Sequence, residues 1–254
     1  SALTTNTTGD NLTAVGYLAL TANTTGTNSV AVGSRALDAN TTANNNVAIG
    51  YAALGANTTG YSNTAVGFSA SEVSTTGVQN TCIGNKAGEA ITTGSAHTCV
   101  GNRAGDGITT GVNNLLLGQD ATASSATVSN EVTFGDGNIS AIRCQVQTIS
   151  SLSDVRDKTD IVDLPYGIDF INKLRPVQFV WNMRDNPNSP HQGKTRNGFI
   201  AQELLELGNN DQHQLVMDNN PEKLEAAYSA MLPMAIKAIQ ELSAKVDELE
   251  TKLN

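Results

Sequence analysis

The stretch Asn63-Thr64-Ala65-Val66-Gly67 decides the fold of the first half of this chain, because it returns in altered form every 17 residues. An apolar residue followed by glycine ends each copy, an alanine stands three residues after most of these glycines, and a Thr-Thr pair falls between copies. The apolar-glycine steps are Val15-Gly16, Val32-Gly33, Ile49-Gly50, Val66-Gly67, Ile83-Gly84, Val100-Gly101, Leu117-Gly118 and Phe134-Gly135. Three markers in one phase indicate a true structural repeat.

A fixed period of this length is typical of a solenoid, in which each unit is one coil and buries its apolar edge against its neighbours. The β-branched residues around Val66 predict a short strand, whereas the Asn and Thr-Thr-Gly stretches supply turns. We therefore expect residues 1–135 to form a mainly β shaft, either a β-solenoid with 17-residue coils or a trimeric β-prism, with two brief strands and two turns in each unit.

The small residues of the repeat leave little apolar area to bury in one chain, so association of several chains is expected. The pattern resembles the head repeats of trimeric bacterial adhesins and the shafts of viral fibres, in which three chains share an axial core. The resemblance implies a homotrimer in a virion tail fibre or an extracellular, cell-surface fibre. Because solenoid faces repeat their side chains regularly, a host or prey cell-surface receptor or glycan is an expected partner.

The three cysteines support neither a disulfide framework nor a metal site. Cys82 and Cys99 lie 17 residues apart and occupy the slot that Ala48 and Ala65 fill in earlier units, and Cys144 stands outside the repeat. No CxxC or Cys/His cluster is present. We expect Cys82 and Cys99 to be small core residues, with no metal and no cofactor bound by the chain.

Bulk properties exclude several function classes. A formal charge of −9 with scattered acidic residues argues against nucleic acid, whose phosphates need clustered Lys and Arg. No apolar run is long enough to span a bilayer. Only 4% of residues are aromatic and no paired carboxylates recur, which disfavours a carbohydrate-active enzyme. The chain starts at Ser1 without a secretory signal, so we expect a soluble fragment of a longer protein.

The composition changes after the repeat. Residues 136–152 form a connecting region, with a strand expected over 138–149 because apolar and polar residues alternate there. From Ser153 onward the chain holds its single Trp and all six Pro, which is typical of a compact domain. Within it we expect a strand over 177–181, a polar loop over 184–197, an apolar run over 199–201 and a short helix over 202–207 stopped by Gly208.

The C-terminal end has the pattern of a coiled coil. Apolar residues alternate in steps of three and four, which is the seam along which coiled-coil helices pack. They are Leu232, Ala235, Ile239, Leu242, Val246, Leu249 and Leu253. We expect a helix over 221–254 that starts near Pro221 and bends or restarts at Pro233. The alternative is a helix that packs on its own domain. The repeat favours three helices in the coiled coil.

The stretch Leu152-Ser153-Asp154-Val155-Arg156-Asp157-Lys158-Thr159-Asp160-Ile161 resembles the start of a known domain family. This is the auto-cleaving intramolecular chaperone at the C-termini of phage endosialidases, tail spikes and neck appendages, also found in the myelin regulatory factor. Three further landmarks follow in the family's order: Leu174-Arg175-Pro176-Val177 with Phe179 and Trp181, Gly198-Phe199-Ile200-Ala201-Gln202-Glu203, and Tyr228 to Leu242. The resemblance implies a small α+β chaperone domain over 153–254 ending in a trimeric coiled-coil helix.

The resemblance also implies an activity. The family's domain trimerises and folds the preceding fibre and is then released by cleavage, here at the Leu152-Ser153 bond, with Ser153 as nucleophile and Lys158 as its partner. A lysine amine can take the serine proton if burial or positive charge lowers its pKa from about 10.4 toward neutrality. Such a serine/lysine peptidase acts once, on its own chain. The five-residue spacing predicts a bend there rather than a helix face.

The residues around the pair allow other interpretations. Arg156, Gln202 and Glu203 are expected as supporting residues, although Gln202 and Glu203 equally suit local hydrogen bonding. Taken without the resemblance, Ser-Asp-x-Arg is typical of a helix N-cap or an exposed turn. His97, His191 and His213 are widely separated and form no triad with Ser153. The alternative function is a structural or adhesive fibre that does not cleave and keeps this domain as a permanent trimeric tip.

Overall fold

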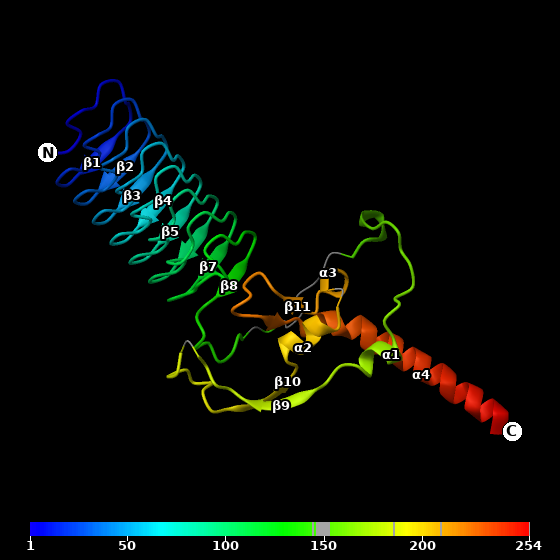
Figure 1. Cartoon of the computed structure of the whole chain (residues 1–254). Helices are drawn as coiled ribbons and strands as arrows, with labels where there is room; N and C mark the ends of the chain where they lie inside the picture. Colours follow the sequence, from blue (N-terminus) through cyan, green and yellow to red (C-terminus); the bar gives the residue numbers. More distant parts are fainter. Residues whose placement is uncertain (144, 146–152, 185, 209, 254) are drawn as a thin grey trace. The chain divides into compact units, whose positions relative to one another are not determined.

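The computed structural model describes residues 1–143, 145, 153–184, 186–208 and 210–253. The chain divides into two compact units, Ser1–Ile139 and Ser140–Asn254, which are described separately below. Figure 1 shows the first as a stack of coils and the second as a smaller mixture of helices and short strands. No helix in the described part of the chain is both long and apolar enough to cross a membrane.

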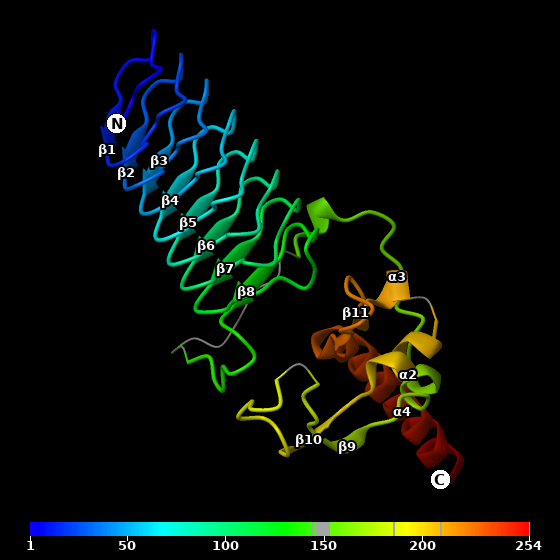
Figure 2. The same ribbon diagram turned by 60° about the vertical axis from the view of Figure 1, so that its left-hand side comes forward.

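The first unit is a β-solenoid in which each coil contributes one three-residue strand. The strands pair in parallel and in register as one sheet in the order β1 to β8, so that each residue lies beside the one 17 positions on. Figure 2 shows them aligned along one side of the stack. They are β1 (Thr13–Val15), β2 (Val30–Val32), β3 (Val47–Ile49), β4 (Thr64–Val66), β5 (Thr81–Ile83), β6 (Thr98–Val100), β7 (Leu115–Leu117) and β8 (Val132–Phe134).

The expectation of two strands in each coil is wrong. Left-handed residues interrupt the rest of the coil, as at Ala52 and Leu54, whose φ angles are +52° and +51°. Because such residues break an extended backbone, the coils contact one another there by separate hydrogen bonds rather than by a second ladder, as where Leu54 N donates to Ala70 O. The glycine after each of the strands β1 to β6 is required by this close stacking: a Cβ on Gly67, for example, would lie 2.1 Å from the Gly84 carbonyl oxygen.

The shaft core is narrow, and neighbouring coils fill it differently. The central residue of each strand points inward, and Cys82 and Cys99 lie fully buried in this row beside Ala65, which confirms their expected place. In the coil of Ala48 the core is completed by Leu54. At Cys82 the equivalent of Leu54 is Gly88, which makes room for the sulfur atom. The core therefore keeps its volume by exchanging large and small residues within one coil.

We predict that Gly88→Leu destabilises the shaft. A Cβ at this position would lie 2.6 Å from Cys82 Sγ and 2.8 Å from Ile91 Cδ1. Overpacking of this kind costs about 1–3 kcal/mol. The triple variant Cys82→Ala/Gly88→Leu/Ile91→Asn restores the residue types of the alanine coils and is expected to recover most of the loss. Urea unfolding of both variants tests this, and equal stability of the triple and single variants would refute the exchange.

A buried row of polar side chains runs alongside the strands. The backbone N–H groups of Asn63 and Asn80 donate to the side-chain oxygens of Asn46 and Asn63, at 2.9 Å each. His97 takes the next place: its N–H donates to Asn80 Oδ1 and its Nδ1 accepts from Asn114 N at 3.3 Å. The imidazole thus replaces an asparagine, with Nδ1 in the role of Oδ1, and it must be unprotonated at that atom.

We predict that this histidine makes the shaft sensitive to acid. Burial lowers the pKa of His97 below its ordinary value of 6.5. A depressed histidine pKa means that the folded shaft favours the neutral ring, so its stability is complete above about pH 6.5 and falls as the pH drops below it. His97→Asn restores the row without a titrating group.

The test compares urea midpoints of the wild-type chain and His97→Asn from pH 7.5 to 5. We expect the wild type to fall behind the variant only on the acid side. His213 in the second unit also has a pKa lowered by burial and provides the control, because its contribution is the same in both chains. A difference between the chains that does not change with pH would contradict the role of the ring.

The second unit has a small core and two hairpins. Its elements are η1 (Val155–Asp157), α1 (Ile168–Ile171), β9 (Val177–Val180), β10 (Thr195–Gly198), α2 (Ala201–Glu206), α3 (Asn210–His213), β11 (Val216–Met217), β12 (Glu225–Ala226), η2 (Tyr228–Met231) and α4 (Leu232–Leu253). The pairs β9/β10 and β11/β12 are antiparallel. The buried cluster consists of Phe170, Leu204, Leu215, Val216, Met231 and Met234.

Most local expectations for this unit are confirmed, but the polar loop and the strand over 138–149 need correction. The strand over 177–181 and the short helix before Gly208 are present as β9 and α2. The polar loop is shorter than expected, because residues from Thr195 onward pair with β9. Residues 138–143 form no strand, since Asn138 and Ile139 turn back to Asp136. Of the remainder of that stretch, only Gln145 lies within the described residues.

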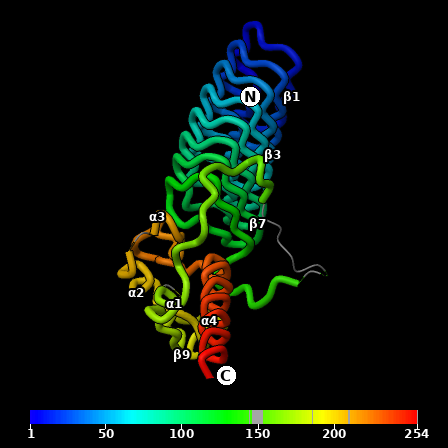
Figure 3. Tube along the Cα trace, turned by 90° about the vertical axis from the view of Figure 1, so that its right-hand side faces the viewer, coloured from blue at the N-terminus to red at the C-terminus, as the bar shows by residue number. Residues whose placement is uncertain are grey.

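The long helix α4 starts later than expected. It begins at Leu232 rather than near Pro221, and β12 lies between the two positions. Pro233 therefore stands in the first turn, where its missing N–H group is not needed, and produces no bend. Figure 3 shows α4 as one continuous helix to the C-terminus.

Candidate functional site

A single 3-10 turn brings Lys158 back to Ser153. Asp154 caps η1 by accepting a hydrogen bond from Arg156 N at 2.9 Å, and Lys158 N donates to Val155 O to close the turn. Lys158 Nζ then lies 2.5 Å from Ser153 Oγ and 3.5 Å from the Ser153 carbonyl oxygen. This is the bend that the five-residue spacing predicts, and it places an amine in contact with a serine hydroxyl.

The pair lies open to solvent in the single chain. Every residue from Ser153 to Asp163 is exposed, including the apolar side chains of Val155, Ile161 and Val162 at 66, 66 and 81%. Such large apolar side chains are rarely left this exposed, and another surface can cover them. The site is therefore assembled locally, without support from the core of its own unit.

Arg156 is paired with Asp154. Its guanidinium lies 2.6 Å from the Asp154 carboxylate, which lowers the pKa of Asp154 and raises that of Arg156. Because both residues of this ion pair lie in the turn between Ser153 and Lys158, the ion pair holds the turn closed. Arg156 therefore contributes to the shape of the site, and its charge is directed at Asp154.

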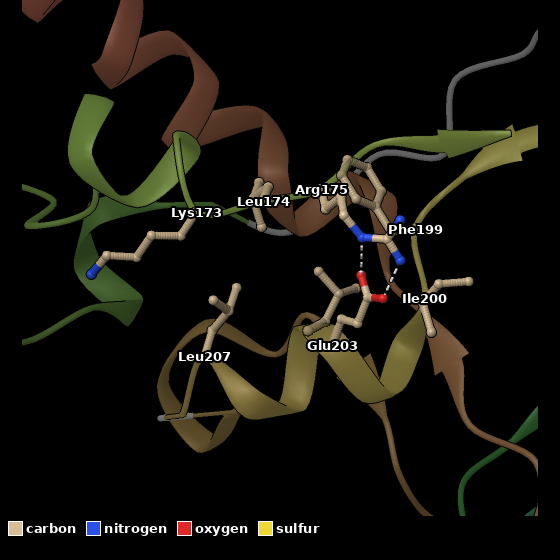
Figure 4. Close-up of a pocket in the computed structure, with 8 residues that line it drawn as sticks. Lys173, Leu174, Arg175, Phe199, Ile200, Glu203 and Leu207 are labelled. Carbon is tan, nitrogen blue, oxygen red and sulfur yellow. Dashed lines mark hydrogen bonds and ion pairs between the residues drawn. The ribbon is translucent and has the colours of Figure 1, made fainter.

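Gln202 and Glu203 are not brought to the pair. Glu203 accepts two hydrogen bonds from the Arg175 guanidinium, which lowers the pKa of Glu203. Figure 4 shows the two side chains facing each other beside Phe199 and Ile200, at a hollow of about 20 Å³ that has room for little more than a water molecule. Gln202 is exposed. Among the described residues, no hydrogen bond or ion pair joins either residue to Ser153 or Lys158.

The remaining site expectations concern the bond to be cut and bound ions. Leu152, and with it the Leu152-Ser153 bond, lies outside the described residues. No group of three or more His, Cys, Asp or Glu side chains in the described part of the chain could hold a metal ion.

Helix α4 carries a second candidate surface. Its first two turns pack on their own unit: Met234 and Ala238 are buried, and Met234 belongs to the same buried cluster as Phe170 of α1. The predicted seam, on a neighbouring face of the helix, is exposed: Leu232, Ile239, Leu242, Val246, Leu249 and Leu253 are 45 to 86% accessible. The helix thus packs on its own unit through one face, and the predicted coiled-coil seam remains uncovered in the single chain.

Two contacts in this unit join segments that are far apart in the sequence and were not predicted from it. The Glu241 carboxylate accepts a hydrogen bond from Ile168 N at 2.8 Å and so caps α1, which is 73 residues away in sequence. A Cβ on Gly167 would lie 2.2 Å from the same carboxylate, which explains the glycine there. The ion pair between Arg175 and Glu203 is the other. Both join distant segments, for which the sequence carries no periodic signal.

Comparison with known proteins covers the start of this unit. Residues 153–212 match the family described as chaperone of endosialidase. The second unit carries an endosialidase-type chaperone domain. The match begins at Ser153, includes Lys158, Arg175 and Glu203, and ends before α4. Searches of curated proteins and of solved structures returned no match. A β-solenoid shaft followed by this chaperone domain is the organisation of a tail-fibre-like protein.

Proposed function

We propose that the chaperone domain assembles three copies of the chain into a tail-fibre-like or surface adhesive fibre and is then released by cleavage before Ser153. The observation that carries the cleavage step is the 2.5 Å contact between Lys158 Nζ and Ser153 Oγ at the first residues of the matched domain. The exposed seam of α4 supports assembly, and the resemblance to trimeric fibres favours three copies.

The chemistry follows from the placement of the two side chains. Lys158, as a free amine, takes the proton of the Ser153 hydroxyl, and Oγ attacks the carbonyl carbon of Leu152. The C–N bond then breaks, the Ser153 nitrogen gains a proton as an amine, and Leu152 is held as an ester on Oγ. Water hydrolyses this ester, leaving a carboxylate on Leu152 and a free hydroxyl on Ser153. The hydroxyl and the bond belong to one chain, so each chain reacts once.

The exposed site favours a link between cleavage and assembly. An amine and a hydroxyl in open solvent gain little from their contact, whereas exclusion of water strengthens every electrostatic interaction in a site. Val155 within the turn, and Ile161 and Val162 shortly after it in the sequence, are exposed apolar side chains that a second copy would cover. In this proposal, assembly comes first and cleavage follows in the covered site.

Intact-mass measurement of freshly expressed chain tests the cleavage step. The proposal expects two products, residues 1–152 and residues 153–254, to accumulate with time from the 26.5 kDa chain. Persistence of the full-length chain in its assembled form would instead favour the alternative fibre, in which the domain stays on as a permanent tip.

A receptor or glycan as partner and a virion or cell surface as location also belong to this proposal. They rest on the regular presentation of side chains along the shaft and on the tail-fibre-like organisation. Binding of the purified shaft to glycans of known composition would test the first.

A further inference from the structure

The outer face of the shaft sheet is apolar along its whole length. Each strand has three residues, of which the central one points into the coil and the first and third point outward. The outward positions hold twelve apolar residues and four threonines, and no charge. They are Thr13, Val15, Val30, Val32, Val47, Ile49, Thr64, Val66, Thr81, Ile83, Thr98, Val100, Leu115, Leu117, Val132 and Phe134.

In a single chain this apolar sheet face is left in contact with water. None of the sixteen side chains is buried: six are exposed, with Val15 at 58% and Phe134 at 57% accessible at the two ends of the sheet, and the other ten are half-buried. Parallel sheets are usually covered on both faces, and a face that meets water normally carries polar residues. With strands about 4.8 Å apart, the eight-stranded face is roughly 34 Å long. A continuous apolar surface of this size marks an interaction site.

The charged residues of the coils lie elsewhere. They concentrate in the turn after the glycine, where ion pairs join Arg35 to Asp38, Lys86 to Glu89 and Arg103 to Asp106. The shaft thus separates a charged turn, suited to water, from a neutral sheet face. A charged partner would lose its hydration on that face without gaining an ion pair. A neutral apolar partner has no charge to desolvate.

The regular spacing of the face identifies the partner. One pair of outward side chains, apolar or threonine, stands on every strand, and the strands lie about 4.8 Å apart over the eight strands of the sheet. Only a partner surface whose side chains repeat at the same spacing can contact every strand of this face in the same way. A second copy of this chain has that repeat, presents the same residues and carries no opposing charge.

The face is not uniform along its length. Strands β4 to β6 present threonine with Val66, Ile83 or Val100. Strands β7 and β8 instead present apolar residues at all four outward positions, namely Leu115, Leu117, Val132 and Phe134. Because hydrophobic stabilisation grows with the apolar area removed from water, contact at β7 and β8 contributes most. Copies displaced by one coil would lose that contact at the end of the face.

We propose that the outer face of the β1 to β8 sheet is the surface along which copies of this chain pack in the shaft, with β7 and β8 as the strongest contact. The number of copies rests on the proposed function. The surface itself follows from the shaft alone.

Cross-linking of full-length chains tests the surface. Ile83→Cys places a thiol on the face, and Thr76→Cys places one on an exposed turn of the neighbouring coil as control. Cys144→Ser is included in all chains, and the native Cys82 and Cys99 are fully buried. With a short bis-maleimide reagent, most Ile83→Cys chains are expected to become covalently joined while Thr76→Cys chains stay single. Equal, low yields from both would overturn the proposal.

A third variant separates this inference from the proposed function. Leu249→Cys on the α4 seam reports on assembly by the chaperone domain. If Leu249→Cys chains become cross-linked and Ile83→Cys chains do not, the result would support assembly through α4 and refute the sheet face as the packing surface. The reverse result would support the sheet face and refute assembly through α4. Single chains at both positions would refute both.

The gradient along the face has its own test. Leu117→Thr/Phe134→Thr and Val66→Thr/Ile83→Thr change the same outward positions, and threonine already occupies outward positions in this sheet. We expect the first pair to lower the urea concentration at which the copies dissociate by more than the second pair. Equal shifts would refute β7 and β8 as the strongest contact.

Discussion

A chain with Ser153→Ala is expected to stay at full length under conditions in which the wild-type chain separates into residues 1–152 and 153–254. The substitution removes the only hydroxyl that contacts Lys158 Nζ among the described residues, and alanine offers no nucleophile in its place. Loss of cleavage should therefore be complete. Intact-mass spectra taken over a time course after expression measure it.

Two substitutions of the lysine show whether it acts as a base. Lys158→Ala removes the amine and is expected to slow cleavage by about a hundredfold to ten-thousandfold, the usual contribution of a general base. Lys158→Arg keeps length and charge, but a guanidinium does not give up its proton in proteins and cannot accept one from serine. It should fail as Lys158→Ala does. Wild-type cleavage by Lys158→Arg would contradict the role of base.

Matched controls come from the same region. Thr159→Ala removes an exposed hydroxyl next to Lys158, and Lys173→Ala removes an exposed lysine outside the site. Both chains should cleave at the wild-type rate. If Thr159→Ala also stops cleavage, the effect lies in the fold of the segment and the assignment of Ser153 loses its support.

The double variant Leu242→Lys/Leu249→Lys is expected to abolish assembly through α4. Both leucines are more than half exposed in the single chain, at 52 and 59%, so the change should leave the unit's own core intact. In an assembled seam each would be buried, at a gain of about 1.5–3 kcal/mol per side chain, and a lysine reverses that gain. Sedimentation at micromolar concentration should shift from the assembled species to single chains.

The control for this variant places the same charge on the far side of the helix. Ala244→Lys/Thr251→Lys adds two lysines at exposed positions away from the seam. Its assembly should match that of the wild type. Assembly that survives in the Leu242→Lys/Leu249→Lys chain would show that the seam does not hold the copies together.

Local and periodic features of this fold could be predicted from the sequence. The 17-residue period, the strand around Val66 and the buried row of Cys82 and Cys99 follow from side chains that repeat in one phase. The number of strands in each coil could not be predicted, because left-handed residues such as Leu54 and Ser71 break the extended backbone and show no distinctive residue type.

The candidate site was only partly predictable. A bend between Ser153 and Lys158 follows from their spacing, whereas the pairing of Arg156 with Asp154 depends on side-chain geometry inside the turn. The distant contacts are beyond pattern reasoning. The sequence predicts that Glu203 lies in a short helix. It does not indicate that Glu203 pairs with Arg175, which lies 28 residues earlier.

Native mass spectrometry of the wild-type protein shows directly whether the chaperone domain assembles copies of the chain. We expect a species of three chains, each 26.5 kDa when uncleaved. A single-chain mass across the micromolar range would contradict it.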